Sequence, residues 1–226
     1  MSHMSLVPVW LDWSGRTVLV IGLGEVGQRR ALIFQQAGAT VVGVDPLPKN
    51  AGPAWGELIR GGLELRAEPY DRSIFDELTQ YQMKPDLVLA SATAEVNRRV
   101  VSDARALGLW VASATGHGDS TANAHLGTVA EGRQVSIAVH SGNVAPALSK
   151  TVRDQLAEKF LPAADRIACE AALWRQEILD NQPDPEQRRR MLALFGLPEI
   201  LNLEQKAHGT DLEKLRELLK ENLAED

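Results

Sequence analysis

The chain has 226 residues, of which 44% are hydrophobic and 24% charged, so it is long and apolar enough to fold around a sizeable core. Its 24 Lys and Arg residues are outnumbered by 30 Asp and Glu residues, which gives a net charge of −6. This balance argues against a general nucleic-acid binder, because such proteins need excess cations to neutralise phosphates.

Cys169 is the only cysteine of the sequence. A single thiol excludes an internal disulfide and a cysteine metal cluster. No segment has the pattern of a signal peptide or of a membrane span. We therefore expect a cytoplasmic protein that does not associate with membranes.

From about residue 14 to 115, apolar runs alternate with helical or polar segments. Five runs have the character of strands: Thr17 to Ile21, Thr40 to Val44, Leu63 to Ala67, Asp86 to Ala90, and Leu109 to Ala112. Helical patterns occupy Glu25 to Ala37, Ser73 to Gln80, and Glu95 to Leu107. Because strands that alternate with helices imply crossover connections, this part predicts a doubly wound α/β domain of the Rossmann type with a parallel sheet.

The pattern changes after this domain. Two apolar runs, Leu126 to Ala130 and Val135 to Val139, flank a short turn and predict a β-hairpin. Pro146 opens a long helical segment that reaches about Asp180. The stretch Asn181 to Gln187 is typical of a linker, and Thr210 to Asn222 predicts an amphipathic terminal helix. We therefore expect three regions, at residues 5–115, 116–160 and 161–226.

The most specific motif is the glycine turn after the first predicted strand. Gly22, Gly24 and Gly27 fit the pattern G-x-G-x-x-G, in which the first glycine allows a tight turn, the second lets a pyrophosphate approach the backbone, and the third allows close helix–strand packing. The following helix begins at Glu25 and Val26 and offers unpaired N–H groups to phosphates. With a strand before it and a helix after it, the motif predicts dinucleotide binding.

Asp45 ends the second predicted strand, at about the twenty-residue separation expected for an acid that binds a ribose. A carboxylate there favours NAD over NADP, because it would repel the 2′-phosphate. The alternative is a turn residue before Pro46.

The fourth predicted strand is followed by three small residues, Ser91, Ala92 and Thr93. They lie at the carboxyl edge of the sheet, where they fit a loop pressed against the nicotinamide or its ribose. The alternative is that Thr93 caps the next helix.

Several stretches in order along residues 5 to 195 resemble the siroheme synthase / precorrin-2 dehydrogenase family. They are "LVPVWLDWSGRTVLVIGLGEVGQRRA", "GGLELRAEPYD", "LVLASATAEVNRRVVSDAR", "VSIAVHSGNVAPALSKTVRDQLAEKFLP" and "EQRRRMLALF". An ordered series of this kind is far more specific than the glycine motif alone.

The resemblance implies a Rossmann domain, a dimerisation region that includes the hairpin, and a helical C-terminal region. It also implies an NAD-dependent homodimer that oxidises precorrin-2 to sirohydrochlorin, and some members of the family also insert ferrous iron. Asn97 matches the family's "VN" and is a further expected cofactor-binding residue. Because oxidation removes a hydride and a proton, the site needs a proton acceptor beside the cofactor.

The chain departs from the family where that acceptor is expected. The family's catalytic aspartate follows the fifth strand, and here the corresponding stretch, Ala112 to Thr121, is "ASATGHGDST". Counted back from Ser141 without gaps, the aspartate position falls on His117; counted forward from the strand, it falls on Thr115. Asp119 takes the place only if the loop is shifted.

The family's paired serines correspond to His140 and Ser141. We take His117, Asp119, His140 and Ser141 as the catalytic candidates, because imidazoles and carboxylates accept protons near neutral pH when suitably placed. The alternatives are an exposed loop histidine at His117, a turn or helix cap at Asp119, and a half-exposed strand end at His140.

A substrate with eight carboxylates needs cations, and the clusters available are Arg98 with Arg99, Lys150 with Arg153, and Arg188 to Arg190. Solvated helix faces are the alternative for each cluster. No two histidines have a tight ligand spacing, so we expect no permanent metal site. The leading hypothesis is an NAD-dependent precorrin-2 dehydrogenase; its rivals are an NAD-binding protein without catalysis and a dehydrogenase for another substrate.

Overall fold

The computed structural model describes residues 6–48, 53–114, 122–142, 144–196 and 201–202. The chain divides into two compact units. The N-terminal unit holds Met1–Leu126 with Gly142–Val144, and the C-terminal unit holds Gly127–Ser141 with Ala145–Asp226. Each unit is described separately below.

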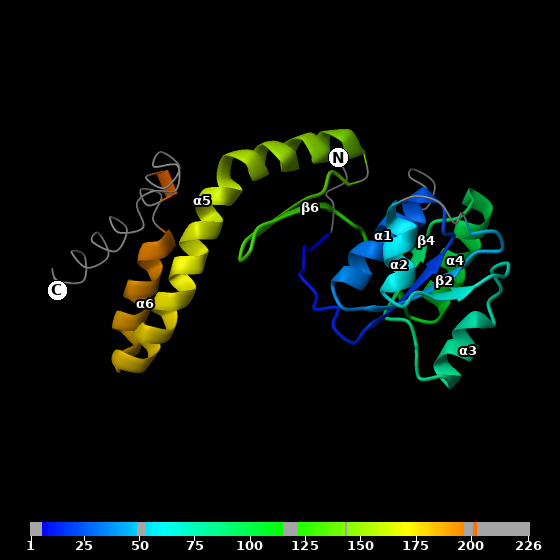
Figure 1. Cartoon of the computed structure of the whole chain (residues 1–226), viewed down its shortest axis with the longest axis horizontal. Coiled ribbons are helices and arrows are strands. Elements are labelled where there is room, and N and C mark those ends of the chain that lie inside the picture. The colour runs from blue at the N-terminus through cyan, green and yellow to red at the C-terminus, as the bar shows by residue number, and fades with distance from the viewer. Residues whose placement is uncertain (1–5, 49–52, 115–121, 143, 197–200, 203–226) are drawn as a thin grey trace. The chain divides into compact units, whose positions relative to one another are not determined.

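The N-terminal unit contains a five-stranded sheet in the order β3-β2-β1-β4-β5, with all neighbours parallel (Figure 1). The strands are β1 (Thr17–Ile21), β2 (Thr40–Val44), β3 (Glu64–Arg66), β4 (Leu87–Ala90) and β5 (Trp110–Ser113). The helices are α1 (Glu25–Gln36), α2 (Pro53–Arg60), α3 (Ile74–Gln80) and α4 (Ala94–Ala106). The predicted doubly wound Rossmann-type sheet is confirmed, including its reversal of strand order between β1 and β4.

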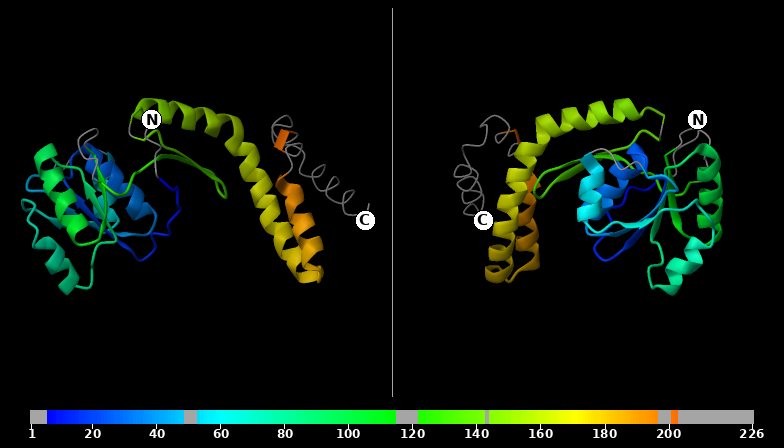
Figure 2. Two further views of the ribbon diagram at one scale, coloured as in Figure 1. Left: turned by 180° about the vertical axis from the view of Figure 1, so that it is seen from behind. Right: turned by 45° about the vertical axis from the view of Figure 1, so that its right-hand side comes forward.

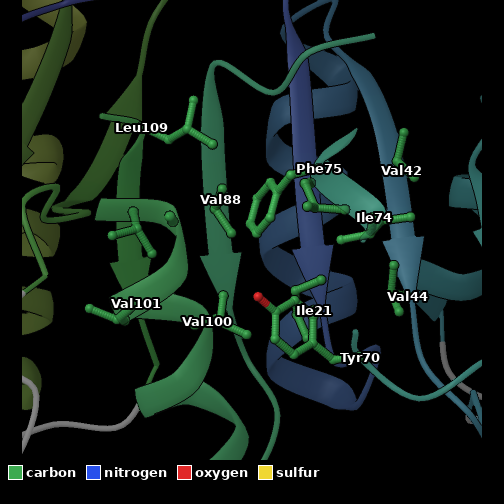
Figure 3. Packing of buried hydrophobic residues seen from close by; sticks show 14 of the residues in the cluster. Ile21, Val42, Val44, Tyr70, Ile74, Phe75, Val88, Val100, Val101 and Leu109 are labelled. Carbon is green, nitrogen blue, oxygen red and sulfur yellow. The ribbon is translucent and has the colours of Figure 1, made fainter. Parts of the chain in front are cut away.

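The two faces of this sheet form two separate cores, because successive side chains of a strand point to opposite faces. On β1, Val18 and Val20 belong to the core with α1 and α2. Leu19 and Ile21 belong to the core with α3 and α4, which Figure 3 shows from close by. All five residues of β1 are buried, as expected for a central strand covered on both faces.

Polar bonds fix β1 at its start. The Asp86 carboxylate accepts a hydrogen bond from the Thr17 N–H at 2.9 Å and another from Nη1 of Arg16 at 3.0 Å. Asp86 precedes β4, so these bonds fasten the first residue of β1 to the neighbouring strand. The Arg16–Asp86 pair is partly exposed, and its main role is therefore to set position rather than to add stability.

The edge strand β5 is covered by Asn123 and Ala124 rather than by another strand, and the N–H groups of both residues donate to the Val111 carbonyl at 3.2 and 3.0 Å. Oδ1 of the Asn123 side chain accepts from the Val111 N–H at 2.8 Å, and Nδ2 of the same side chain donates to the Leu109 carbonyl at 3.1 Å. One amide group thus satisfies a donor and an acceptor of the edge backbone, which limits pairing with other chains there.

Most predicted elements of this unit are confirmed to within one or two residues, but α2 was not predicted. Its segment is only eight residues long and contains Gly56, which weakens a helical pattern in the sequence. The helix forms because Leu58 is fully buried in the core with α1, and the Leu58 carbonyl accepts from Nε2 of Gln35 at 3.0 Å.

The C-terminal unit contains the predicted hairpin and the predicted long helix. Its elements are the antiparallel pair β6 (Thr128–Glu131) and β7 (Ser136–Val139), then α5 (Pro146–Asn181), α6 (Pro185–Ala193) and a short 3₁₀ helix, Leu194–Gly196. Figure 2 shows that α5 bends along its length. Pro162 lies inside α5, and its missing N–H and its ring account for a bend.

The predicted linker, Asn181 to Gln187, is shorter than expected. Helix α6 begins at Pro185, because Asp184 caps it by accepting from the Glu186 N–H at 2.8 Å. The predicted terminal helix, Thr210 to Asn222, lies outside the described residues.

A carboxylate of α5 holds the turn of the hairpin. Oδ1 of Asp165 accepts from the N–H of Gln134 at 2.5 Å and from that of Val135 at 2.9 Å. A Cβ at Gly132 would lie 2.6 Å from the same oxygen, so the glycine allows the close approach. The pKa of Asp165 is held below its ordinary value by these N–H groups, first by that of Gln134.

Candidate functional site

The glycine turn lies at the carboxyl edge of the sheet, where β1 is flanked by β2 and β4. Gly22 has φ of 92°, which only glycine adopts readily, and a Cβ there would come within 2.6 Å of the Ser91 carbonyl. A Cβ at Gly27 would lie 1.9 Å from the Gly22 oxygen. Gly22 thus permits the tight turn and Gly27 the close packing of α1 on β1, while their part in cofactor binding stays a prediction.

Gly24 differs from the other two, because a Cβ built on it meets no atom of the described residues within 4 Å apart from those of its chain neighbours. It is the N-cap residue of α1 and supplies no side chain to the free N–H groups. The first residues of α1, Glu25 and Val26, are exposed. The space beside Gly24 therefore combines open volume with the positive end of a helix, which suits a phosphate.

Asp45 faces the same turn. Its Oδ2 accepts from the Leu23 N–H at 2.6 Å, and its Oδ1 accepts from the Leu47 N–H at 2.8 Å. Each carboxylate oxygen has a second lone pair, so hydroxyl groups of a ribose can still bind. The turn role before Pro46 and the ligand role are therefore compatible.

Leu23 is locked into the turn by contacts that the sequence motif does not include. Its side chain is fully buried over Gly43, where a Cβ would lie 2.7 Å from Cδ1 of Leu23. Its carbonyl accepts from Nε2 of buried Gln28 at 2.8 Å. Sequence reasoning missed Gln28 and Gly43, because a helix glutamine and a strand glycine have no distinctive pattern.

The loop after β4 lies against the glycine turn. Asn97 is fully buried, and its side-chain amide accepts from the Ala92 N–H at 2.9 Å and donates to the Ala92 carbonyl at 3.2 Å. Thr93 caps α4 by accepting from the Val96 N–H at 3.4 Å. Helix capping, the alternative to a cofactor contact at this residue, is therefore present. Asn97 thus fixes the loop.

Ser91 provides a direct sign of a ligand in this loop. Its Oγ is buried and has no hydrogen-bond partner among the described residues. Buried hydroxyl groups are rarely left unbonded. Together with the open space at Gly24 and the carboxylate of Asp45, this orphaned oxygen fits a bound dinucleotide.

The catalytic candidates are only partly within the described residues. His117 and Asp119 lie outside them, as does Thr115. His140 is half-buried in the C-terminal unit. Oγ of Ser141 accepts from the Ala145 N–H at 3.2 Å and from the Ser149 hydroxyl at 2.8 Å, so it stabilises the start of α5.

Arg153, Arg99 and Arg190 are candidate cations for substrate carboxylates that are already engaged within the protein, and Arg190 pairs with Glu186 at 3.6 Å. Nε of Arg153 donates to the Asp154 carboxylate at 2.8 Å, and its Nη1 donates to Oγ1 of Thr128 at 2.7 Å. The Arg99 guanidinium lies 5.8 Å from the centre of the Tyr70 ring. The contacts of Arg153 and Arg99 also hold elements together.

Metal and membrane features are absent from the described part of the chain. It contains no group of three or more His, Cys, Asp or Glu residues arranged to hold a metal ion. None of its helices combines the length and the apolar character needed to cross a membrane.

Residues 9–125 match the family described as putative NAD(P)-binding. The siroheme synthase of Chromobacterium violaceum is 29% identical over 218 residues, which cover 93% of this chain and 44% of that protein. Siroheme synthase 1 of Halorhodospira halophila is 31% identical over 186 residues, covering 81% of this chain and 36% of that protein. The chain thus spans less than half the length of these relatives.

A solved structure, SirC, a precorrin-2 dehydrogenase, has the same fold. The TM-score is 0.70 at 18% sequence identity, with 92% of this chain and all of that chain covered. Because residues 9–125 match the putative NAD(P)-binding family, the N-terminal unit is an NAD(P)-binding domain, as the glycine turn predicts. The chain belongs to the putative NAD(P)-binding family, and it is similar to siroheme synthases over most of its own length.

Proposed function

We propose that this chain is an NAD-dependent dehydrogenase that oxidises precorrin-2 to sirohydrochlorin. Three observations carry the proposal: the open space beside Gly24, the Asp45 carboxylate bonded to the Leu23 N–H of the same turn, and the orphaned Ser91 hydroxyl in the loop that lies against Gly22. They occur in a chain that is similar to siroheme synthases over most of its length. Substrate and reaction are inferred from that similarity, and cofactor binding from the geometry.

The oxidation removes one hydride and one proton from the macrocycle and yields NADH and H⁺. Bound NAD⁺ supplies the hydride acceptor. Backbone N–H groups at the start of α1 would hold the pyrophosphate, and Asp45 would accept from ribose hydroxyls. Asn97 fixes the loop of Ser91 and Ala92 against the cofactor.

The proton needs an acceptor among this chain's own residues. We propose His117 or Asp119, both of which follow β5 in the sequence, with His140 and Ser141 as further candidates. An imidazole is suited to this role because it titrates near neutral pH.

We infer that the active form is a homodimer. The hairpin packs one face on α5 and leaves the other exposed, including the cross-strand pair Val129 and Ala138. A two-stranded ribbon with unpaired edges is a suitable surface for a second copy. Sedimentation equilibrium tests this, with twice the mass of 24.7 kDa expected and a monomer as the contrary result.

We also infer a cytoplasmic location, since a lone cysteine and a reaction that uses NAD both suit a reducing compartment.

The decisive experiment mixes the purified protein with NAD and enzymatically made precorrin-2 in the absence of air. NADH formation at 340 nm is the expected result, where 340 nm is about the absorption maximum of reduced nicotinamide. NAD binding without NADH formation would favour the rival hypothesis of a non-catalytic protein. Loss of NAD binding would reject both. Adding ferrous iron to the product tests chelation separately.

The proton acceptor is tested by replacing His117 and Asp119 separately with Ala. We expect one replacement to lower kcat by about 100-fold or more, the usual contribution of a general base. Unchanged rates in both variants would reject the assignment and turn attention to His140.

A further inference from the structure

Two buried side-chain atoms lack a hydrogen-bond partner in the described part of the chain, and both belong to the N-terminal unit. One is Oγ of Ser91, which lies in the candidate site. The other is Nη1 of Arg30, in the second turn of α1. Arg30 does not belong to any cluster that the sequence pattern identified. Its unpaired nitrogen needs a separate explanation, because guanidinium groups removed from water are normally paired.

The position of Arg30 on α1 follows from its neighbours. Gln35 marks the side of the helix that faces α2, since its Nε2 donates to the Leu58 carbonyl. Phe34 marks the other side, where its ring packs edge-on against Trp13 with centroids 4.8 Å apart. Arg30 precedes Phe34 by one turn, so it lies on the Phe34 side, away from α2.

The Arg30 side of α1 can be assigned to one half of the cofactor site. Helical side chains lean toward the N-terminal end of their helix, so the Arg30 guanidinium extends over the turn near Gly27, toward the carboxyl edge of the sheet. Asp45, at the end of β2, marks the adenosine half of the cofactor site. Helix α2 connects β2 to β3, so it lies on the Asp45 side of α1. The Arg30 side of α1 is the opposite side, and it corresponds to the nicotinamide half, where a substrate meets the cofactor.

The charge of Arg30 is poorly compensated. Burial, and then the neighbouring Arg29, lower the pKa of the Arg30 guanidinium, although it remains charged. By contrast, the guanidinium of Arg153 bonds to a carboxylate, and that of Arg99 lies over an aromatic ring. Nη1 of Arg30 therefore has no acceptor within the described part of the chain.

We propose that Arg30 binds a carboxylate of the substrate on the nicotinamide side of the cofactor site, an inference that rests on the proposed function. A guanidinium pairs with a carboxylate through two parallel hydrogen bonds, which neutralise the charge and also orient the ligand. The pyrophosphate is a less suitable partner. Arg30 follows Gly24 by six residues, about 9 Å along the helix axis, and the free N–H groups of the first turn already serve phosphate.

The test compares Arg30→Met with Arg29→Met as the matched control. Met retains much of the length and apolar character of the stem but removes the charge, and Arg29 is the exposed neighbour on the same helix. The probe is uroporphyrin, a stable octacarboxylate porphyrin, titrated by fluorescence in the presence of NAD. Three further readouts are the Kd of NAD, the melting temperature, and the KM for precorrin-2.

We expect Arg30→Met to weaken uroporphyrin binding and to raise the KM for precorrin-2 by about 10- to 100-fold, the usual effect of losing a charged hydrogen-bond pair. The Kd of NAD should change by less than about twofold, and the melting temperature should not fall, because no internal bond is lost. Arg29→Met should match the wild type, and Arg30→Lys should recover part of the affinity.

Unchanged uroporphyrin binding in Arg30→Met would overturn the proposal, as would equal losses in both Met variants. Weaker NAD binding would instead assign Arg30 to the cofactor, and a lower melting temperature would assign it to the fold. If the wild-type protein binds uroporphyrin but does not oxidise precorrin-2, the proposed reaction is wrong. The comparison of uroporphyrin binding between the variants still tests Arg30 in that case. Wild-type protein that binds no uroporphyrin would reject the substrate class and Arg30's role in it.

Discussion

At the scale of single residues, the three glycines of the turn are not equivalent. Gly27→Ala should lower the free energy of unfolding by about 3 kcal/mol or more, because the new Cβ would lie 1.9 Å from a backbone oxygen that cannot move freely. Urea unfolding checks this. Stability equal to the wild type would show that α1 can shift away from β1.

Gly24→Ala should separate binding from stability. Gly24 has φ of −66°, which alanine adopts, and no atom of the described residues lies within 4 Å of the added methyl group apart from those of its chain neighbours. We expect the free energy of unfolding to stay within about 1 kcal/mol of the wild type. NAD affinity should fall by about tenfold or more, because the methyl group holds the pyrophosphate away from the backbone. Unchanged affinity by calorimetry would place the pyrophosphate elsewhere.

Asp45→Asn should change cofactor preference without dismantling the turn. An amide oxygen can still accept from the Leu23 N–H, whereas the negative charge that repels a 2′-phosphate is lost. We expect NAD to bind about tenfold more weakly, as befits a weakened hydrogen bond to a charged group, and NADP to bind no more weakly than before. A wild-type protein that prefers NADP would contradict this interpretation of Asp45.

Residue types with a distinctive spacing were predictable, but residues that act through tertiary contacts were not. The positions of the glycines and Asp45 follow a motif whose physical basis is local, namely a turn between a strand and a helix. Gln28, Arg30 and Asn123 have no such signature. Their roles depend on which backbone groups lie opposite them once the fold has formed.

At the scale of elements, β5 depends on the amide group of Asn123. Asn123→Ala should lower the free energy of unfolding by about 1–3 kcal/mol, because it leaves the Val111 N–H and the Leu109 carbonyl without partners. Thermal unfolding should show a decrease of several degrees, roughly 3–8 °C for a unit of this size. An unchanged melting temperature would show that water replaces the amide group at no cost.

The hairpin turn should respond to acid through Asp165. Because its pKa is depressed in the folded protein, the carboxylate stabilises the turn above the pKa of the unfolded chain, and this stabilisation is lost as the pH falls through the lowered folded value. The amide signals of Gln134 and Val135 in NMR spectra should therefore titrate with a midpoint below the ordinary range of an aspartic acid. In Asp165→Ala that titration should be missing, and its persistence would identify another acid.

Element boundaries show what a sequence pattern can and cannot specify. Strongly apolar strands such as Thr17–Ile21 and Thr40–Val44 were placed to the residue, because every one of their inward positions is apolar or small. Helix α2 was not predicted, because it is short and contains Gly56, and its stability depends on burying Leu58 in the core. The start of α6 depends on a cap, Asp184, inside a stretch that otherwise has the composition of a linker.

At the scale of the whole molecule, NAD should stabilise the N-terminal unit selectively. Both extensive cores belong to that unit, whereas the described part of the other unit has a small cluster around Ile167. A ligand at 100 times its Kd adds about 2.7 kcal/mol to the stability of the unit that binds it. Calorimetry should show the transition of the N-terminal unit moving upward. Equal shifts of every transition would indicate that the units unfold together.

The position of the glycine turn depends on how β1 is aligned with the neighbouring strands. Because β1 is apolar on both faces, sliding it by one residue would exchange its two sets of side chains without exposing any of them to water, so hydrophobicity alone does not choose the alignment. Polar bonds at the two ends of β1 determine its alignment. At the start, the Thr17 N–H donates to the Asp86 carboxylate, and at the end, the Gly22 N–H donates to the Val44 carbonyl. Asp86, which binds the start of β1, thus determines how far the glycine turn protrudes at the other end of the strand. Substitutions at Asp86 would therefore alter cofactor affinity from a distance.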